Sequence, residues 1–176
     1  LFPSNTRYFA DTGNSVAWAT HYLHPMNRRV SGQREVKDDL VRVSMEFSSM
    51  GWAIGAAIGS ALGNRNNISV CITGDGSFLM SGQEISVAIQ QQLPVIFIIL
   101  NDQSLGMVKH GQIMSGAEKI GADLPLVNFA QLARAVGAQA FTIHSPQDME
   151  SLDIEAICQH QGPTLLDVYI DKDEVP

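Results

Sequence analysis

The sequence predicts an α/β fold, a doubly wound and mostly parallel sheet of six strands with helices on both faces. Short apolar, β-branched runs alternate with helical patterns along the 176 residues. The run at residues 95–100 is apolar at every position, which is typical of a strand covered on both faces. Charged residues make up only 16% of the chain, as expected when most elements are covered.

Six segments have the length and composition of strands. They are residues 7–10, 40–43, 69–73, 95–100, 138–143 and 164–170. The most polar stretch, residues 25–39, lies between the first two and is predicted to be a solvated connection. Ligands of such sheets bind beyond the carboxyl ends of the strands, so these ends are where a site is expected.

Helices between the strands are marked by capping residues and by glycines. Three starts are predicted: a capping box at Ser81–Glu84 with a helix up to Pro94, Asn128 with a helix up to Gly137, and Ser145 followed by Pro146. Glycine recurs every fourth residue from Gly51 to Gly63. This spacing leaves one helix face without side chains and predicts close packing against a neighbouring element.

Length, charge and cysteine content restrict the class of protein. Residues 1–176 fit a single domain, and the start at Leu1 without a methionine suggests a domain excised from a longer chain. The net charge of -7 argues against binding to nucleic acid, and no apolar run reaches the ~18 residues of a membrane span. Cys71 and Cys158 form no CxxC pair, which indicates a reducing compartment such as the cytoplasm.

Two acidic residues follow neighbouring strands of the predicted sheet. Asp75 lies in Gly74-Asp75-Gly76-Ser77 directly after the strand at 69–73, and Asp102 follows the next strand. The 24 residues between Gly76 and Asn101 hold one helix and one strand, a single crossover that returns to the same sheet edge. Glycine amides can cradle a phosphate, and the two carboxylates could hold Mg²⁺. A Gly-Asp-Gly turn in a non-catalytic α/β nucleotide-binding or interaction module is the alternative.

These motifs resemble the signature of thiamine diphosphate enzymes, Gly-Asp-Gly followed after such a gap by Asn-Asn. The resemblance is closest to acetolactate (acetohydroxyacid) synthases and covers only their C-terminal, diphosphate-binding domain, from about Tyr8 to the end of the chain. The resemblance is also found in residues 11–15, 50–59 and 93–108. The implied fold is the thiamine diphosphate-binding fold, and the implied cofactors are thiamine diphosphate and Mg²⁺.

The resemblance also implies site residues. The metal ligands would be Asp75, Asp102 and the Ser104 carbonyl, and Met50 would be an apolar wedge beneath the thiazolium ring of the cofactor. The full set of implied cofactor-binding residues is Gly13, Asn14, Ser15, Ser48, Met50, Gly74, Asp75, Gly76, Ser77, Asp102, Ser104, Leu105, Gly106 and Met107. Residues 101–125 are predicted to be a mobile loop over the site, and His110 within them to be either a substrate-facing or a solvated loop histidine.

Three departures from the family pattern bear on function. Asp102 replaces the second asparagine, Gly111 stands where the synthases usually carry a tryptophan, and no residue matches the activating glutamate, which another domain is expected to supply. No catalytic residue is therefore expected in this chain, and alone it should bind cofactor weakly and be inactive.

The implied reaction is decarboxylation of a small 2-oxo acid and transfer of the product to a second carbonyl. A simple 2-oxo acid decarboxylase of the benzoylformate or pyruvate type is the alternative. The expected partners are the N-terminal domains and a second subunit of a homodimer or tetramer, with FAD as a further cofactor that the full-length enzyme could bind.

Overall fold

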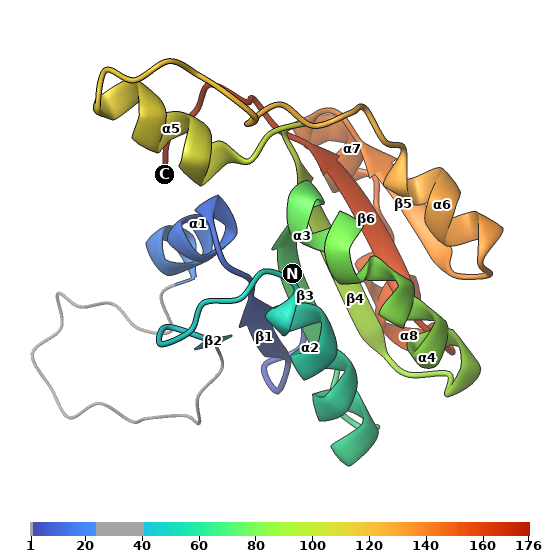
Figure 1. Ribbon diagram of the computed structural model, residues 1–176. Coiled ribbons are helices and arrows are strands. Elements are labelled where there is room, and N and C mark those ends of the chain that lie inside the picture. The colour runs from blue at the N-terminus through green and yellow to red at the C-terminus, as the bar shows by residue number, and fades with distance from the viewer. Residues whose placement is uncertain (1, 24–40) are drawn as a thin grey trace, which may run out of the picture.

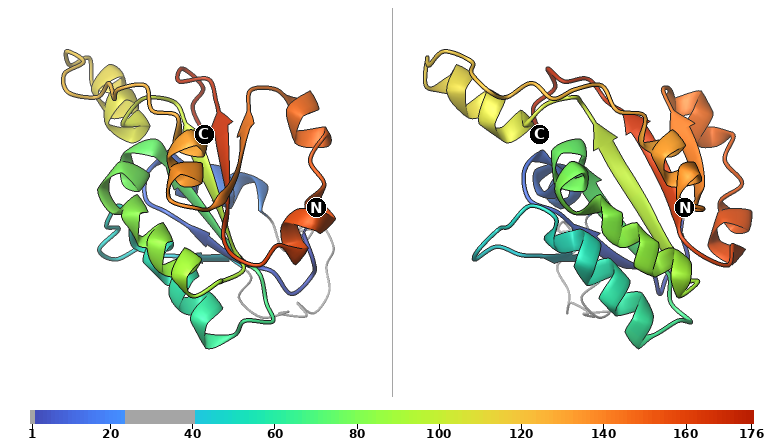
Figure 2. Two further views of the ribbon diagram at one scale, coloured as in Figure 1. Left: turned by 90° about the vertical axis from the view of Figure 1, so that its right-hand side faces the viewer. Right: turned by 45° about the vertical axis from the view of Figure 1, so that its right-hand side comes forward.

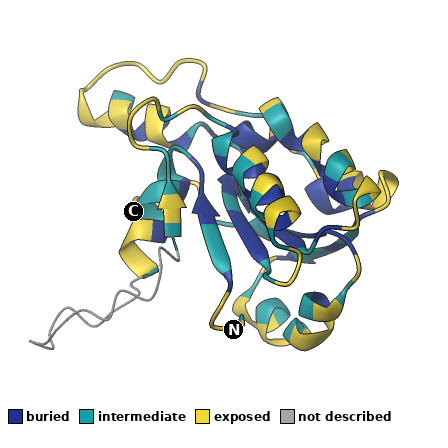
Figure 3. Ribbon diagram, turned by 90° about the horizontal axis from the view of Figure 1, so that it is seen from below, coloured by how far each residue is buried: buried dark blue, intermediate teal, exposed yellow. Residues whose placement is uncertain are grey.

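The structure is a computed structural model and describes residues 2–23 and 41–176. The predicted connection at 25–39 and the first residue of the predicted second strand, Leu40, lie outside the described residues. The described part forms a central sheet flanked by helices, with the buried residues concentrated in the strands and on the inner helix faces (Figures 1, 2 and 3).

Six parallel strands make up the sheet, which confirms the predicted fold class. They are β1 (Arg7–Ala10), β2 (Val41–Val43), β3 (Ser69–Gly74), β4 (Val95–Asn101), β5 (Gln139–Ile143) and β6 (Thr164–Tyr169). The strand order is β2-β1-β3-β4-β6-β5, and every pairing is parallel. The chain runs outward in one direction from β1 to β2 and in the other from β3 to β4. The switch point therefore lies between β1 and β3, where a crevice for ligands is expected.

Helices cover both faces of the sheet. They are α1 (Asn14–Tyr22), α2 (Trp52–Gly63), α3 (Asp75–Ser81), a 3-10 turn (Gly82–Glu84), α4 (Ile85–Gln90), α5 (Gly106–Met114), α6 (Phe129–Ala135), α7 (Pro146–Glu150) and α8 (Ile154–Gln159). One core joins α2, α4 and α6 to the sheet through residues such as Ile54, Phe97 and Phe129. A second core, with Ile96 and Ile157, lies on the other face and includes α8. None of these helices is long and apolar enough to cross a membrane.

Two of the three predicted helix starts are confirmed. The Asn128 side chain accepts a hydrogen bond from the Gln131 amide, and Ser145 forms a capping box with Asp148. The capping box predicted at Ser81 is wrong, because the chain becomes helical at Asp75, directly after β3, and Ser81 ends that helix without capping the next turn.

Two further expectations need correction. The close packing predicted for the glycines at 51–63 is found only at Gly51, where an added Cβ would lie 2.8 Å from Ser81 Cβ. Gly55, Gly59 and Gly63 are exposed, and a Cβ added there would meet no atom within 4 Å, so this part of the face packs against no other described element. Residues 101–125 are not all loop, because α5 forms within them and buries Lys109 and His110. A histidine in a solvated loop is therefore excluded for His110.

Candidate functional site

The carboxyl end of β1 is anchored by Asp11, which is fully buried. One of its carboxylate oxygens, Oδ2, accepts hydrogen bonds from the Thr73 hydroxyl at 2.8 Å and from the Gly51 amide at 2.9 Å. This single side chain therefore connects the end of β1 with β3 and with the start of α2. It holds in place the loop that leads through Gly13 (φ 93°) into α1. This role of Asp11 was not predicted, although a charged residue directly after a strand was a usable signal.

At the end of β3 the chain turns from Gly74 directly into α3. The Asp75 carboxylate accepts a hydrogen bond from the Gly76 amide at 2.7 Å, and Asp75 is 3% exposed. A Cβ on Gly76 would lie 2.7 Å from Leu105 Cδ2 and 3.3 Å from Met50 Cε. Side chains from three other segments, including Leu124 at 3.3 Å from this Cβ, therefore approach the Gly76 backbone closely, and a larger residue there would push them away.

Asp102 follows β4 at the same edge of the sheet. Gly74 and Leu100 are register partners, so Asp75 and Asp102 leave adjacent strands at nearly the same level. Asp102 Oδ1 accepts a hydrogen bond from the Ser104 amide at 3.1 Å, and the intervening Gln103 has a left-handed backbone (φ 55°). This tight turn also directs the Gln103 and Ser104 amides toward the Asp75 carboxylate. The two carboxyl groups thus lie on the same side of the sheet and in each other's electric field.

The electrostatics of the two carboxyl groups reflect this proximity. Burial, followed by the negative charge of Asp102, raises the pKa of Asp75 from 3.8 to about 6. Burial also raises the pKa of Asp102, while the Ser104 amide and the nearby Lys109 and His110 partly oppose the increase. Two buried carboxylates that repel each other are better accommodated when a hard cation lies between them.

A cavity of about 160 Å³ opens at this edge of the sheet. Thirteen of the fourteen predicted cofactor-binding residues line it: Gly13, Asn14, Ser15, Met50, Gly74, Asp75, Gly76, Ser77, Asp102, Ser104, Leu105, Gly106 and Met107. Ser48 does not line it; its hydroxyl donates to the Ser44 carbonyl instead. The cavity also contains residues that the sequence did not single out, among them Trp18, Val108 and Ile170. A larger cavity of about 620 Å³ lies at the opposite edge of the sheet, next to Ile68 and Pro94, and contains none of the predicted residues.

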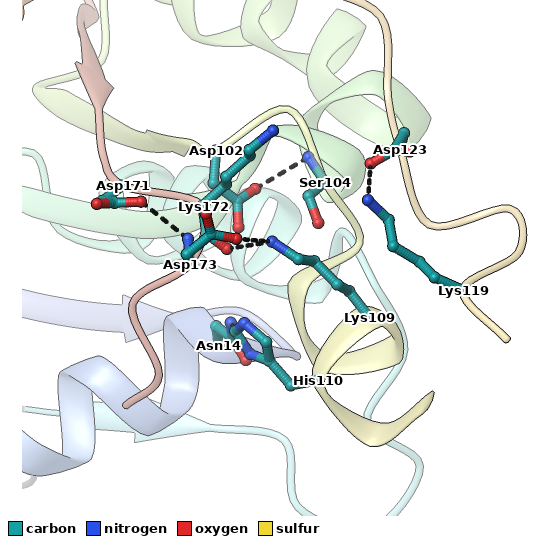
Figure 4. Close-up of polar contacts among 10 residues, drawn as sticks. All are labelled: Asn14, Asp102, Ser104, Lys109, His110, Lys119, Asp123, Asp171, Lys172 and Asp173. Carbon is teal, nitrogen blue, oxygen red and sulfur yellow. Dashed lines mark hydrogen bonds and ion pairs between the residues drawn. The ribbon is translucent and has the colours of Figure 1, made fainter. Parts of the chain in front are cut away.

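Helix α5 crosses this edge of the sheet and is held from two sides (Figures 1 and 4). The Lys109 ammonium, almost fully buried, donates to the Lys172 carbonyl at 2.7 Å and forms an ion pair of 2.6 Å with Asp173. At the next position of α5, His110 Nδ1 lies 3.4 Å from the amide nitrogen of Asn14. The C-terminal segment and the start of α1 are thereby joined to α5, a feature that sequence spacing did not indicate.

Asn101, the first residue of the predicted Asn-Asp pair, has a structural role. Its amide donates to Asp167 at 2.9 Å and to the Val127 carbonyl at 3.1 Å. Asp167 is fully buried in β6, and its second oxygen accepts from the Phe129 amide at 2.9 Å and from the following amide at 3.2 Å, at the start of α6. This network fixes the end of β4, from which Asp102 projects into the cavity.

The chain is similar in sequence to a known family of proteins. The family described as thiamine pyrophosphate enzyme, C-terminal TPP binding domain, matches residues 11–168. The acetolactate synthase large subunit of Pyropia yezoensis is 32% identical over 97% of this chain and 27% of its own length. The isozyme 3 large subunit of Escherichia coli is 38% identical over 73% of this chain and 23% of its own length.

A solved structure shows the same fold. Benzoylformate decarboxylase from Polynucleobacter necessarius superposes with a TM-score of 0.83 at 23% sequence identity, over 99% of this chain and 32% of that one. The chain thus spans about a quarter of the length of the curated relatives that it matches. On the family match and the identity to these relatives, the chain belongs to the thiamine pyrophosphate enzyme family and carries its C-terminal TPP-binding domain.

Proposed function

We propose that this chain binds thiamine diphosphate through a Mg²⁺ ion held by Asp75, Asp102 and the Ser104 carbonyl. The observation that carries the proposal is the pair of buried carboxyl groups at adjacent strand ends, each with a raised pKa. Within the described part of the chain, no three His, Cys, Asp or Glu side chains gather as metal ligands. The remaining ligands would therefore be diphosphate oxygens and water, which suits Mg²⁺.

Glycines and small polar residues around the carboxylates suit the diphosphate. Asn14, Ser15 and Ser77 line the cavity beside Gly76, where the absence of a side chain leaves room for close approach of a ligand to the backbone. The positions Gly13, Gly74 and Gly106 extend this cradle. We assign these residues to diphosphate binding, and Leu105 and Met107 to the apolar wall.

Met50 and Ser48 are assigned to the organic part of the cofactor. Met50 lines the cavity next to Gly76, as expected for an apolar wedge. Ser48 lies outside the lining, but its left-handed backbone (φ 47°) turns the chain just before Met50, which supports a role for its backbone alone. When bound, the thiazolium ring supplies an electron sink for decarboxylation of a 2-oxo acid; the residues of this chain bind, orient and shield it.

For the whole protein we propose a 2-oxo acid decarboxylating carboligase of the acetolactate synthase type. Support comes from the identity to synthase large subunits over most of this chain. The activating glutamate, the other half of the site and any FAD would come from further domains or a second subunit of a homodimer or tetramer, so this chain alone should turn over nothing. Its two free cysteines suit the reducing cytoplasm.

A simple 2-oxo acid decarboxylase remains the second candidate, because Gly111 presents no side chain on α5 where the synthases usually carry tryptophan. Gly111 is exposed, and a Cβ added there would meet no atom within 4 Å. Product analysis of the full-length enzyme with pyruvate distinguishes the two reactions. Acetolactate supports the carboligase, and acetaldehyde alone supports the decarboxylase.

Calorimetry of the chain with thiamine diphosphate tests the cofactor assignment. We expect binding in the presence of Mg²⁺, a large loss of affinity after addition of EDTA, and no binding of thiamine, which lacks the diphosphate. Asp75→Asn should abolish the Mg²⁺ dependence, whereas Glu118→Gln, an exposed change that removes the same charge, should leave it intact. Binding that is equally strong with and without metal would refute the proposal.

A further inference from the structure

The charged side chains that line the cavity at the carboxyl ends of the strands are all acidic. Asp75 and Asp102 lie in its wall and are 3% and 8% exposed. Among the described lining residues none is lysine, arginine or histidine, and the others are glycines, uncharged polar residues and apolar residues. An anion that entered this cavity alone would therefore meet two buried carboxyl groups and no positive side chain to offset them.

The basic residues of α5 do not supply the missing positive charge. The Lys109 ammonium is directed to the C-terminal segment, where it donates to Asp173 at 2.6 Å and to a backbone carbonyl at 2.7 Å (Figure 4). His110 does not line the cavity. Neither Asp75 nor Asp102 takes part in an ion pair within the described part of the chain. Their negative charges thus have no counter-ion there.

The oxygen atoms of this pair suit a hard cation with open coordination positions. Asp75 and Asp102 leave adjacent strands at nearly the same level, so both carboxyl groups lie at one edge of the sheet. Asp102 Oδ1 accepts from the Ser104 amide at 3.1 Å, while Oδ2 accepts no hydrogen bond from a described side chain. No third His, Cys, Asp or Glu side chain joins them among the described residues. The other positions around an ion would therefore fall to backbone, water or diphosphate oxygens.

We propose that Asp75 and Asp102 bind a divalent cation before thiamine diphosphate arrives, and that this cation attracts the diphosphate to the cavity. The cation neutralises the pair whether or not the cofactor is present, whereas the diphosphate is repelled until the cation is bound. This inference rests on the proposed function, because it takes the cavity as the cofactor site, and it adds the order of binding. Loading of the cofactor is then controlled by the concentration of free cation. In the alternative order the cation arrives with the cofactor, and the chain alone has no affinity for it.

Titration with Mn²⁺ alone, followed by the electron paramagnetic resonance signal of the free ion, tests the inference. We expect one ion to bind per unmodified chain. Asp75→Asn and Asp102→Asn should each weaken binding about 10-fold or more, because each removes one of the two charges that hold the ion. Glu118→Gln and Glu174→Gln remove the same charge from exposed positions and should bind Mn²⁺ as the unmodified chain does. Glu174 is the sharper control, because it lies beside Asp173 in the acidic C-terminal segment.

Calorimetry with pyrophosphate in EDTA gives an independent readout, and we expect no binding. Binding of metal-free pyrophosphate to the unmodified chain would overturn the inference. So would an unmodified chain that binds Mg²⁺-thiamine diphosphate but no Mn²⁺ alone, since the cation would then arrive with the cofactor and only the proposed function would stand. Mn²⁺ binding that both aspartate variants retain in full would place the ion elsewhere and refute the inference. A chain that does not bind Mg²⁺-thiamine diphosphate at all would defeat both the inference and the proposed function.

Discussion

Asp102→Asn should stabilise the metal-free chain while weakening its hold on Mg²⁺. Without metal, Asp75 and Asp102 are buried near each other, and the pKa of Asp75 is about 6 in place of 3.8. A difference of roughly 2 pKa units corresponds to about 3 kcal/mol of destabilisation at neutral pH. Asparagine keeps the oxygen that accepts from the Ser104 amide but removes the charge.

Asp102→Asn should recover only part of this energy, because burial is the larger cause of the raised Asp75 pKa and the charge of Asp102 is the second. We expect the free energy of unfolding to rise by about 1 kcal/mol at pH 7 without metal, or roughly 2–4 °C in melting temperature for a chain of this size. Thermal melting in EDTA measures this change. Glu118→Gln controls for the loss of one negative charge.

The stability of the metal-free chain should depend on pH through Asp75. Because the pKa of Asp75 is higher in the folded than in the unfolded chain, the folded chain binds more protons between pH 4 and 6. The contribution of this group to stability therefore falls as the pH rises through that window, and the destabilisation is complete above about pH 6. The free energy of unfolding of Asp102→Asn should fall less steeply with pH over the same window. Equal or lower stability of the variant in EDTA at pH 7 would refute the reasoning.

Magnesium should favour the unmodified chain over Asp102→Asn. Two carboxylates bind the ion more firmly but repel the diphosphate when metal is scarce, so affinity for thiamine diphosphate should depend more steeply on Mg²⁺ concentration in the unmodified chain than in Asp102→Asn. Calorimetric titrations at several Mg²⁺ concentrations measure both slopes. Coincident slopes would contradict the shared-ion geometry.

Three substitutions test other parts of the site. Gly76→Ala should cost about 1 kcal/mol in denaturant unfolding and weaken cofactor binding, because the new methyl group would lie 2.7 Å from Leu105; unchanged binding would argue against a close approach there. Asp167→Ala should cost about 3 kcal/mol in the same assay, because it leaves three buried N–H donors without their acceptor, and a cost below 1 kcal/mol would contradict the network. Asp173→Ala should lower the melting temperature more than Lys109→Met, since only the former leaves a buried ammonium without its counter-ion; the reverse order would show that the ion pair contributes little.

The sheet was predictable because its strands carry strong local signals. The apolar run at residues 95–100 indicated a strand covered on both faces, and the structure places β4 between β3 and β6. Asp75 and Asp102 were predictable because each directly follows a strand, and strand ends of a parallel sheet meet at one edge. The other cavity residues were predicted only through the resemblance to thiamine diphosphate enzymes. The helix start predicted at Ser81 was wrong, because a capping pattern cannot show that the preceding residues are already helical.

Contacts between distant segments were not predictable. The Lys109–Asp173 pair joins residues 64 positions apart, and the Asn14–His110 contact joins residues 96 positions apart. No periodicity encodes such pairs, because they depend on how α5 packs after the sheet has formed. The exposed glycine face of α2 failed as a packing prediction for a related reason, since spacing indicates that a close contact is allowed but does not say which element makes it.

The position of β6 in the sheet has a consequence for synthesis of the protein. This strand is made last, yet it lies between β4 and β5 and is the sole described partner that holds β5 in the sheet. Until it leaves the ribosome, the apolar edge of β4 is open to pairing with other chains. A nascent chain stalled before residue 164 should therefore be prone to aggregate and to need a chaperone, even though every cavity-lining residue except Ile170 has already been translated.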